Sequence, residues 1–207
     1  TIAYRINGKT TYAMEGSIFI AGAGVQWLRD RMKFFKKAPE TEKIVKSLDN
    51  NNDIYLVPAF TGLGAPYWDA NARGVLSGIT RDTSPKEIVR ATIEAVAYQT
   101  FDLFEAMKHD GLRPKIVKVD GGMVMNNWFS QFLSDIVNVK VLRPKVQETT
   151  ALGAAFMAGL QIGVYKSLKD ISKNWHLDKK FSPKMKNKSR STPVSYTHLT
   201  LPTTPRV

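Results

Sequence analysis

KIVKVDGGMVMNN, residues 115–127, decides the fold, because it joins a short strand, a glycine turn and a helix start. Its first half is rich in β-branched residues, which favour a strand: Ile116, Val117 and Val119. Gly121 and Gly122 allow backbone angles closed to other residues, and Asn126 or Asn127 can cap the next helix. Such a turn lets a phosphate approach exposed N–H groups, which predicts a nucleotide site. An ordinary turn that binds nothing is the alternative.

The flanking segments predict an α/β fold. Upstream, residues 84–87 (SPKE) form a capping box with proline at the first helical position, and they begin a helix that runs to about residue 108. The apolar stripe of this helix is expected to be buried: Val89, Ile93, Val96, Phe104 and Met107. Gly111 is a natural stop. Downstream, a helix over 128–136 and a strand over 139–142 complete a βαβ unit.

The N-terminal part predicts a hairpin followed by a long helix. Asn7-Gly8 supplies the two positive φ angles of a type I′ turn. Residues 17–35 carry apolar side chains at helical spacing. Gly22 and Gly24 would lie inside that helix at a cost of about 1 kcal/mol each, so a close neighbour or a ligand should explain them. Since the chain opens inside a strand, we expect an internal fragment whose sheet partners lie upstream.

Three further segments have a distinct composition. The aromatic, glycine-containing loop at 60–69 is typical of functional loops, but Pro66 excludes a dinucleotide fingerprint there. The helix over 149–163 is rich in small residues, which predicts tight packing against a neighbour. From about residue 186 the chain becomes rich in threonine and proline; we expect disorder, and this tail resembles translated adaptor or vector sequence.

Composition excludes several classes of protein. The 207 residues contain no cysteine and three scattered histidines, which argues against disulfides, a zinc enzyme and a cysteine nucleophile. No apolar run approaches the length that spans a bilayer, and we expect a cytoplasmic protein. The net charge of +12 raises the alternative of nucleic-acid binding, but the basic residues are spread among acids, which favours a solvated basic face.

Catalytic constellations are sparse. Ser130 and Ser134 lack a histidine partner in the same unit, so a hydrolase triad has little support. Most carboxylates lie at caps, loop starts or helix faces. Asp120 is the exception that we keep, because α/β proteins place ligands at the ends of parallel strands.

Five segments, in order, resemble the C-terminal domain of the FGGY carbohydrate kinase family. They are AMEGSIFIAGAGVQWLRD (13–30), VPAFTGLGAPYWDANARG (57–74), GVLSGITRDTSPKEIVRATIEAVAYQT (74–100), VDGGMVMNN (119–127) and ETTALGAAFMAG (148–159). The resemblance covers residues 1–185, and the segment from 74 to 94 is similar to the family's second signature. The GAPYW sequence of the aromatic loop is similar to the glycerol-phosphorylating branch rather than to the xylulose or gluconate branches.

The resemblance implies a ribonuclease H-like, actin-like ATPase domain, with a mixed sheet flanked by helices, that forms one wall of an ATP cleft. In similar proteins the nucleotide is held by residues that match Gly22, Gln26, Gly122 and Asn126. To these we add Gly121 from the glycine turn and Ala38, which matches a position beside the nucleotide. The implied cofactors are ATP and Mg²⁺, and the implied substrates are glycerol and ATP. We expect a homo-oligomer with neither a nucleic-acid nor a membrane partner.

In the family, the general base, the glycerol-binding residues and a phosphate-binding hairpin belong to segments without a counterpart in this sequence. Phosphoryl transfer requires the acceptor, Mg²⁺ and the γ-phosphate to be positioned together, so residues 1–185 alone are expected to be inactive. Residues 186–207 are assigned to the disordered or non-native tail. The predicted function is the ATP-binding half of an enzyme that phosphorylates glycerol. The alternatives are a kinase of another polyol or ketose and a basic nucleic-acid-binding domain.

Overall fold

The fold is described from a computed structural model, which describes residues 1–186. The predicted tail therefore lies, apart from its first residue, outside the described residues. The helices are α1 (Gly22–Asp30), α2 (Glu40–Lys46), α3 (Pro85–His109), α4 (Asn127–Val137), α5 (Thr149–Gln161) and α6 (Leu168–Ser172), with a 3₁₀ helix, η1 (Gly122–Met125), before α4. The strands are β1 (Ile2–Ile6), β2 (Lys9–Tyr12), β3 (Tyr55–Val57), β4 (Val75–Ser77), β5 (Ile116–Lys118), β6 (Lys140–Pro144) and β7 (Leu177–Phe181).

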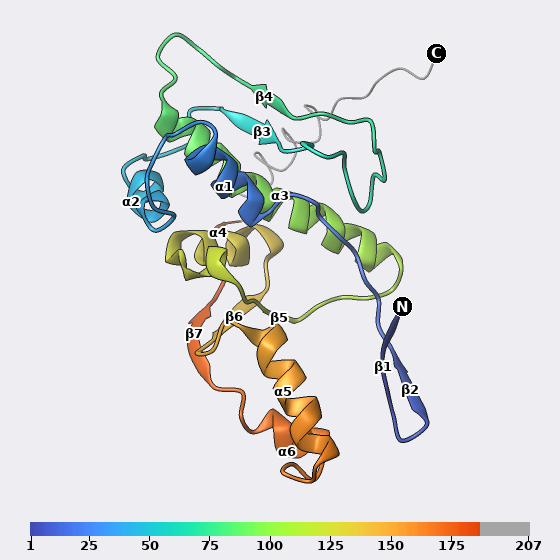
Figure 1. Cartoon of the computed structure of the whole chain (residues 1–207). Coiled ribbons are helices and arrows are strands. Elements are labelled where there is room, and N and C mark those ends of the chain that lie inside the picture. Colours follow the sequence, from blue (N-terminus) through green and yellow to red (C-terminus); the bar gives the residue numbers. More distant parts are fainter. Residues whose placement is uncertain (187–207) are drawn as a thin grey trace.

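The long helix α3 is the centre of the molecule, and α1, α2, α4 and β3 all pack against it (Figure 1). Its start follows the predicted capping box: Ser84 Oγ accepts a hydrogen bond from the backbone N–H of Lys86, and the carboxylate of Glu87 accepts one from the N–H of Ser84 at 2.9 Å. Gly111, with φ +89°, follows its end as predicted. The N-terminal half of α3 is buried nearly all round, whereas Phe104 and Met107 are only half-buried.

The predicted βαβ unit is confirmed. β5 pairs with β6 in parallel, with Val117 opposite Val141, and α4 connects them. β7 then adds to β6 in antiparallel orientation, which gives a mixed three-stranded sheet. The main core lies where α4 packs between α3 and this sheet; its largest fully buried side chains include Leu28, Ile93 and Ile136.

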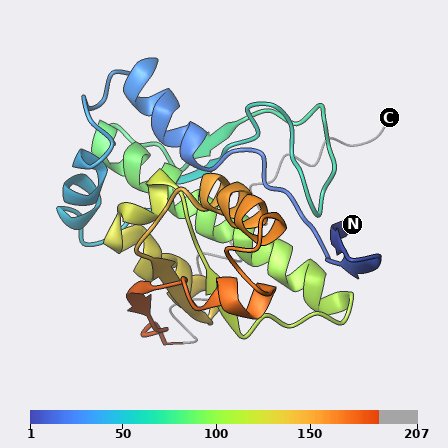
Figure 2. The ribbon, with the colours of Figure 1, turned by 60° about the horizontal axis from the view of Figure 1, so that its bottom comes forward.

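The N-terminal hairpin is also confirmed, with φ of 49° at Asn7 and 77° at Gly8. Figures 1 and 2 both show β1 and β2 at the periphery of the molecule, away from the three-stranded sheet. β3 and β4 form a second two-stranded sheet on α3.

The prediction of a helix over residues 17–35 is wrong in its bounds. α1 begins only at Gly22, because residues 13–21 are irregular and the carbonyl of Ser17 accepts a backbone hydrogen bond from Ala65 at 2.9 Å. Gly22 is therefore the first residue of the helix and not an interior one. Gly24 does have a close neighbour, since a Cβ there would lie 2.9 Å from Thr92 Cγ2.

Within residues 1–186, the small-residue helix α5 does not pack tightly against a neighbour, contrary to the expectation. Along α5, all of whose residues are described, Gly159 is the one buried position. Its neighbour belongs to the following turn: a Cβ on Gly159 would lie 2.8 Å from the ring of Tyr165. Four short elements, α2, α6, β4 and β7, are not among those predicted from the sequence. None of the helices within residues 1–186 has the length and hydropathy needed to cross a bilayer.

Candidate functional site

A cavity of about 280 Å³ lies where α1, α2, η1 and the start of α4 meet. This volume is just below the range of roughly 300–1,000 Å³ that is typical of ligand pockets. Its lining is mostly apolar with a few polar groups, as in other ligand pockets: Gly22, Val25, Gln26, Arg29, Ala38, Pro39, Thr41, Glu42, Ile93, Gly122, Met123, Met125 and Asn126.

Five of the six residues proposed from the sequence line this one cavity: Gly22, Gln26, Ala38, Gly122 and Asn126. The sixth, Gly121, is not among the lining residues. Its φ of +83° makes the turn that leads into η1, so its contribution is to the backbone path. Both glycines allow unusual backbone angles, but of the two only Gly121 has a positive φ.

Two glycines that line the cavity, Gly22 and Gly122, leave its wall without side chains at their positions. A Cβ added to Gly22 or Gly122 would meet no atom within 4 Å, so both positions border open space. Gln26 lies one helical turn after Gly22 and therefore on the same face of α1. The cavity thus has one wall from α1 and one from the glycine turn, and both leave backbone within reach of a ligand.

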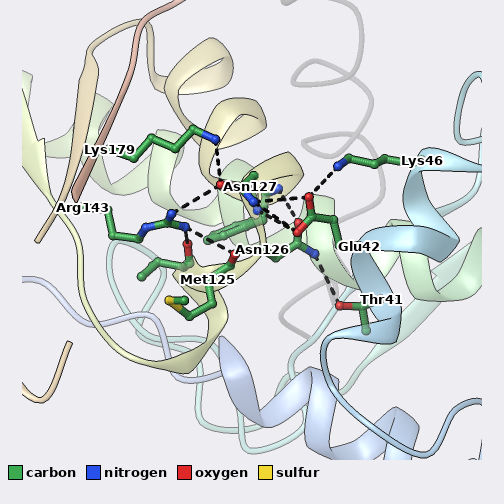
Figure 3. Close-up of polar contacts among 10 residues, drawn as sticks. Thr41, Glu42, Lys46, Met125, Asn126, Asn127, Arg143 and Lys179 are labelled. Carbon is green, nitrogen blue, oxygen red and sulfur yellow. Dashed lines mark hydrogen bonds and ion pairs between the residues drawn. The ribbon is translucent and has the colours of Figure 1, made fainter. Parts of the chain in front are cut away.

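Asn126 joins the glycine turn to α4. It is the N-cap of α4, and its Oδ1 accepts a hydrogen bond from Phe129 N–H at 3.0 Å. Its Nδ2 donates to Thr41 Oγ1 at 3.3 Å, as Figure 3 shows. The half-buried side chain therefore has a defined orientation at the edge of the cavity.

The third wall, which sequence analysis missed, comes from α2. The carboxylate of Glu42 accepts hydrogen bonds from the backbone N–H of Asn127 at 3.2 Å and from Lys46 Nζ at 2.5 Å (Figure 3). Burial acts to raise the pKa of Glu42, but these donors outweigh it and the pKa lies below its ordinary value. Three local signals predict α2: Pro39 before the helix, two acids in its first turn and lysines in its last turn.

Arg143 supports η1 from the side of the three-stranded sheet. It is 6% exposed, and its Nη1 donates to the carbonyl of Val124 at 2.8 Å and to that of Met125 at 3.3 Å. Its Nε pairs with Asp178 at 2.7 Å. Lys179 Nζ donates to Asn127 Oδ1 at 3.0 Å (Figure 3). A buried guanidinium that donates to two carbonyls of η1 restrains the segment between the glycine turn and α4.

The other chemical candidates are structural. Ser130 and Ser134 are fully buried and donate to the carbonyls of Val124 and Val139, at 2.9 and 2.7 Å. Asp120 is exposed and does not line the cavity. No group of three or more histidine, aspartate or glutamate side chains that could hold a metal occurs within residues 1–186.

A larger cleft of about 610 Å³ is lined by Asn50, Asn51, Asn52, Asp53, Thr80, Asp82, Thr83 and Glu87. Two of its polar side chains form hydrogen bonds within the protein: Asn52 Nδ2 donates to Glu87 at 3.3 Å, and Asn51 Nδ2 donates to Glu94 at 3.1 Å. The cavity at the glycine turn is smaller, but it unites the residues that sequence analysis selected, and we take it as the candidate site.

Comparison with known proteins identifies the family. The profile of the FGGY family of carbohydrate kinases, C-terminal domain, matches residues 3–162. The chain belongs to this family. Its fold is the actin-like ATPase fold of FGGY kinases, as predicted from the resemblance.

Several FGGY kinases are similar to this chain over most of its length. Glycerol kinase 1 of Pseudomonas aeruginosa is 56% identical over 190 residues, which are 92% of this chain and 38% of the relative. Glycerol kinase of Marinomonas sp. is 57% identical over 185 residues, 89% of this chain and 37% of the relative. The chain thus spans well under half the length of these relatives.

Solved structures of kinases also resemble this chain in fold. Plasmodium falciparum glycerol kinase with ADP has a TM-score of 0.85 at 38% identity, and the match covers 96% of this chain and 40% of that one. Ligand-bound xylulose kinase from Lactobacillus acidophilus has a TM-score of 0.73 at 25% identity, over 89% of this chain and 37% of that one.

Proposed function

We propose that residues 1–185 form the nucleotide-binding domain of a glycerol kinase, which transfers the γ-phosphoryl group of ATP to glycerol. The observation that carries this proposal is the meeting of Gly22, Gln26, Ala38, Gly122 and Asn126 at one cavity. Identities of 56 and 57% to proteins named glycerol kinase favour glycerol as the acceptor. The similar structure from Plasmodium falciparum, whose name includes ADP, supports a nucleotide as the ligand.

The cavity suits a nucleotide in two ways. Gly121 and Gly122 carry no side chain and border open space, so a ligand can approach the backbone where η1 begins, an arrangement that favours phosphate oxygens. The apolar lining from Val25, Ile93 and Met123 suits a flat aromatic base. Asn126, fixed by its two hydrogen bonds, adds one directed amide at the edge.

In this proposal, Mg²⁺ binds to the protein together with ATP, as MgATP. The one carboxylate that lines the cavity, Glu42, is already paired with Lys46 and Asn127. Mg²⁺ usually keeps several waters and binds through phosphates and one or two carboxylates. The described residues therefore contribute to holding the nucleotide, and the groups that position glycerol and remove its proton belong to other parts of a complete kinase.

The proposal also includes a cytoplasmic location, a homo-oligomer and the absence of a nucleic-acid or membrane partner. Part of the basic charge has internal roles that support this view. Arg90 pairs with the buried Glu94 at 2.7 Å, and Arg143 saturates carbonyls of η1. These guanidinium groups are not free to neutralise a phosphate backbone.

Nuclear magnetic resonance titration of the 207-residue chain with ADP tests the proposal. We expect amide shifts at Gly22, Gln26, Gly122 and Asn126, and no comparable shifts at the cleft around Asn52. A lack of shifts at saturating ADP, or binding of DNA with a steep salt dependence, would overturn it. Activity of the complete gene product with glycerol and with a panel of pentuloses separates a glycerol kinase from a ketose kinase of the same family.

A further inference from the structure

Thr41 forms a hydrogen-bonded link between two walls of the cavity. It lies on α2, is 3% exposed, and its Oγ1 donates to the carbonyl of Ala38 at 2.7 Å. The same oxygen accepts a hydrogen bond from Asn126 Nδ2 at 3.3 Å (Figure 3). The chain of hydrogen bonds therefore runs from the α4 cap through Thr41 to the backbone beside the cavity.

This link sets which side of the Asn126 amide faces α2. A hydroxyl has one hydrogen, and Thr41 donates it to the carbonyl of Ala38. Its oxygen can therefore only accept a hydrogen bond from another neighbour. The neighbour must then be the NH₂ of Asn126 and not its carbonyl oxygen. The cap bond from Phe129 N–H to Asn126 Oδ1 imposes the same orientation from the other side.

The amide keeps part of its capacity for a ligand. An asparagine side chain has two N–H donors and two acceptor lone pairs, and the two bonds use one of each. One donor and one acceptor remain, in fixed directions, on a residue that lines the cavity. We infer that Thr41 is a positioning residue that orders the Asn126 amide for nucleotide binding; this inference rests on the function proposed above.

The position of α2 does not depend on the Thr41 hydroxyl alone. The carboxylate of Glu42 accepts hydrogen bonds from the backbone N–H of Asn127 at 3.2 Å and from Asn127 Nδ2 at 3.4 Å, and both join α2 to α4. Removal of the hydroxyl should therefore leave α2 docked on α4. This makes Thr41→Val, which keeps the size and the branching of the side chain, an informative variant.

We expect Thr41→Val to weaken ADP binding about fivefold, the factor that corresponds to loss of one neutral hydrogen bond. Thr41→Ser, which keeps the hydroxyl, should bind ADP within about twofold of the unmodified protein. Thr92→Val is the matched control: Thr92 is equally buried, but its hydroxyl donates to Ile88 within α3, away from the cavity. Thermal unfolding shows whether each variant is folded.

A double-mutant cycle with Asn126→Ala separates positioning from direct contact. If Thr41 acts through Asn126, Thr41→Val has no further effect on ADP affinity once Asn126 is alanine. An undiminished effect in the Asn126→Ala background, or equal effects of Thr41→Val and Thr92→Val, would overturn the inference.

Hydrogen exchange of the Asn126 side-chain amide measures how well this side chain is ordered, and it needs no ligand. The Nδ2 hydrogens should exchange slowly with water in the unmodified protein and in Thr41→Ser, and faster in Thr41→Val. Unchanged exchange in Thr41→Val overturns the positioning role even if ADP binds. If the unmodified chain does not bind ADP, the proposed function fails, and this exchange measurement alone decides the role of Thr41.

Discussion

Asn126 has two roles in this structure, as the cap of α4 and as a side chain at the cavity, and two substitutions separate them. Asn126→Ala removes the acceptor for Phe129 N–H and should destabilise the fold by about 1 kcal/mol, within the roughly 0.5–2 kcal/mol range for lost N-caps. Asn126→Asp keeps an acceptor of equal capping strength, so the change in stability from the cap should be near zero.

The effect on ligand binding should be the reverse. Asn126→Asp loses both N–H donors of the amide and places a negative charge at a cavity proposed to hold phosphates. Loss of a donor and the new unfavourable charge should each cost roughly 1–3 kcal/mol, which together is a weakening of ADP affinity by about 30-fold or more. Asn126→Ala should weaken it by about 5- to 10-fold.

The assay combines urea unfolding with an ADP titration on the same preparations. We expect Asn126→Asp to be the more stable variant and the weaker binder, and Asn126→Ala to be the less stable variant and the better binder. If aspartate binds ADP as well as asparagine does, the side chain is only a cap and the placement of the ligand is refuted. Ser167→Ala is a matched control for stability, because Ser167 caps α6 and does not line this cavity.

Three further predictions follow from the geometry. Gly122→Val should leave the free energy of unfolding within about 0.5 kcal/mol, because its Cβ meets open space, yet it should reduce ADP affinity in a titration; normal affinity would contradict the site. Gly78→Ala should destabilise the fold by roughly 2–5 kcal/mol in urea unfolding, because φ is +84° and the Cβ would lie 2.0 Å from the carbonyl oxygen of Asp53. Hydrogen bonding from Ser84 holds the pKa of Glu87 below its ordinary value, so the ionised carboxylate stabilises the fold above about pH 5 and this stabilisation is lost as the pH falls through the folded-state pKa. The difference in unfolding free energy between the protein and Glu87→Gln should therefore shrink in acid, and a constant difference would refute the role of the charge.

The parts of the fold that sequence analysis predicted are those with local causes. The hairpin follows from Asn7-Gly8, the start of α3 from Ser84 and Glu87, and the βαβ unit from its alternation of strand and helix patterns. Each of these signals acts within a few residues, so the remainder of the fold is not needed to interpret it.

The errors have non-local causes. The pattern of residues 17–21 is helical, but Ser17 pairs with Ala65 of the aromatic loop, and a contact over that separation leaves no local trace. The small residues of α5 suggest a tight neighbour that is absent from residues 1–186, where Gly159 faces Tyr165 and Val164 of the following turn. β7 forms only because β6 offers a free edge, which residue patterning in 177–181 does not reveal.

The residues of the candidate site also divide into those with a local signal in the sequence and those whose role depends on distant contacts. The glycine turn could be predicted because Gly121 has a local conformational requirement. Thr41 and Glu42 could not, since their importance comes from contacts with Asn126 and Asn127, 85 residues later in the chain. Pro39 and the acids after it do predict a helix there, but not the element on which it docks.

In the sequence, Asn126 is a candidate helix cap and, through the family resemblance, a candidate nucleotide contact. The structure makes the two roles compatible through the count of its hydrogen-bonding groups. Phe129 takes one lone pair, Thr41 takes one N–H, and one of each remains at the cavity. Because the cap fixes the oxygen and Thr41 fixes the nitrogen, the free groups are held in place before a ligand arrives, and such preorganisation lowers the entropic cost of binding. The residue that caps α4 is thus also prepared to recognise a polar ligand edge.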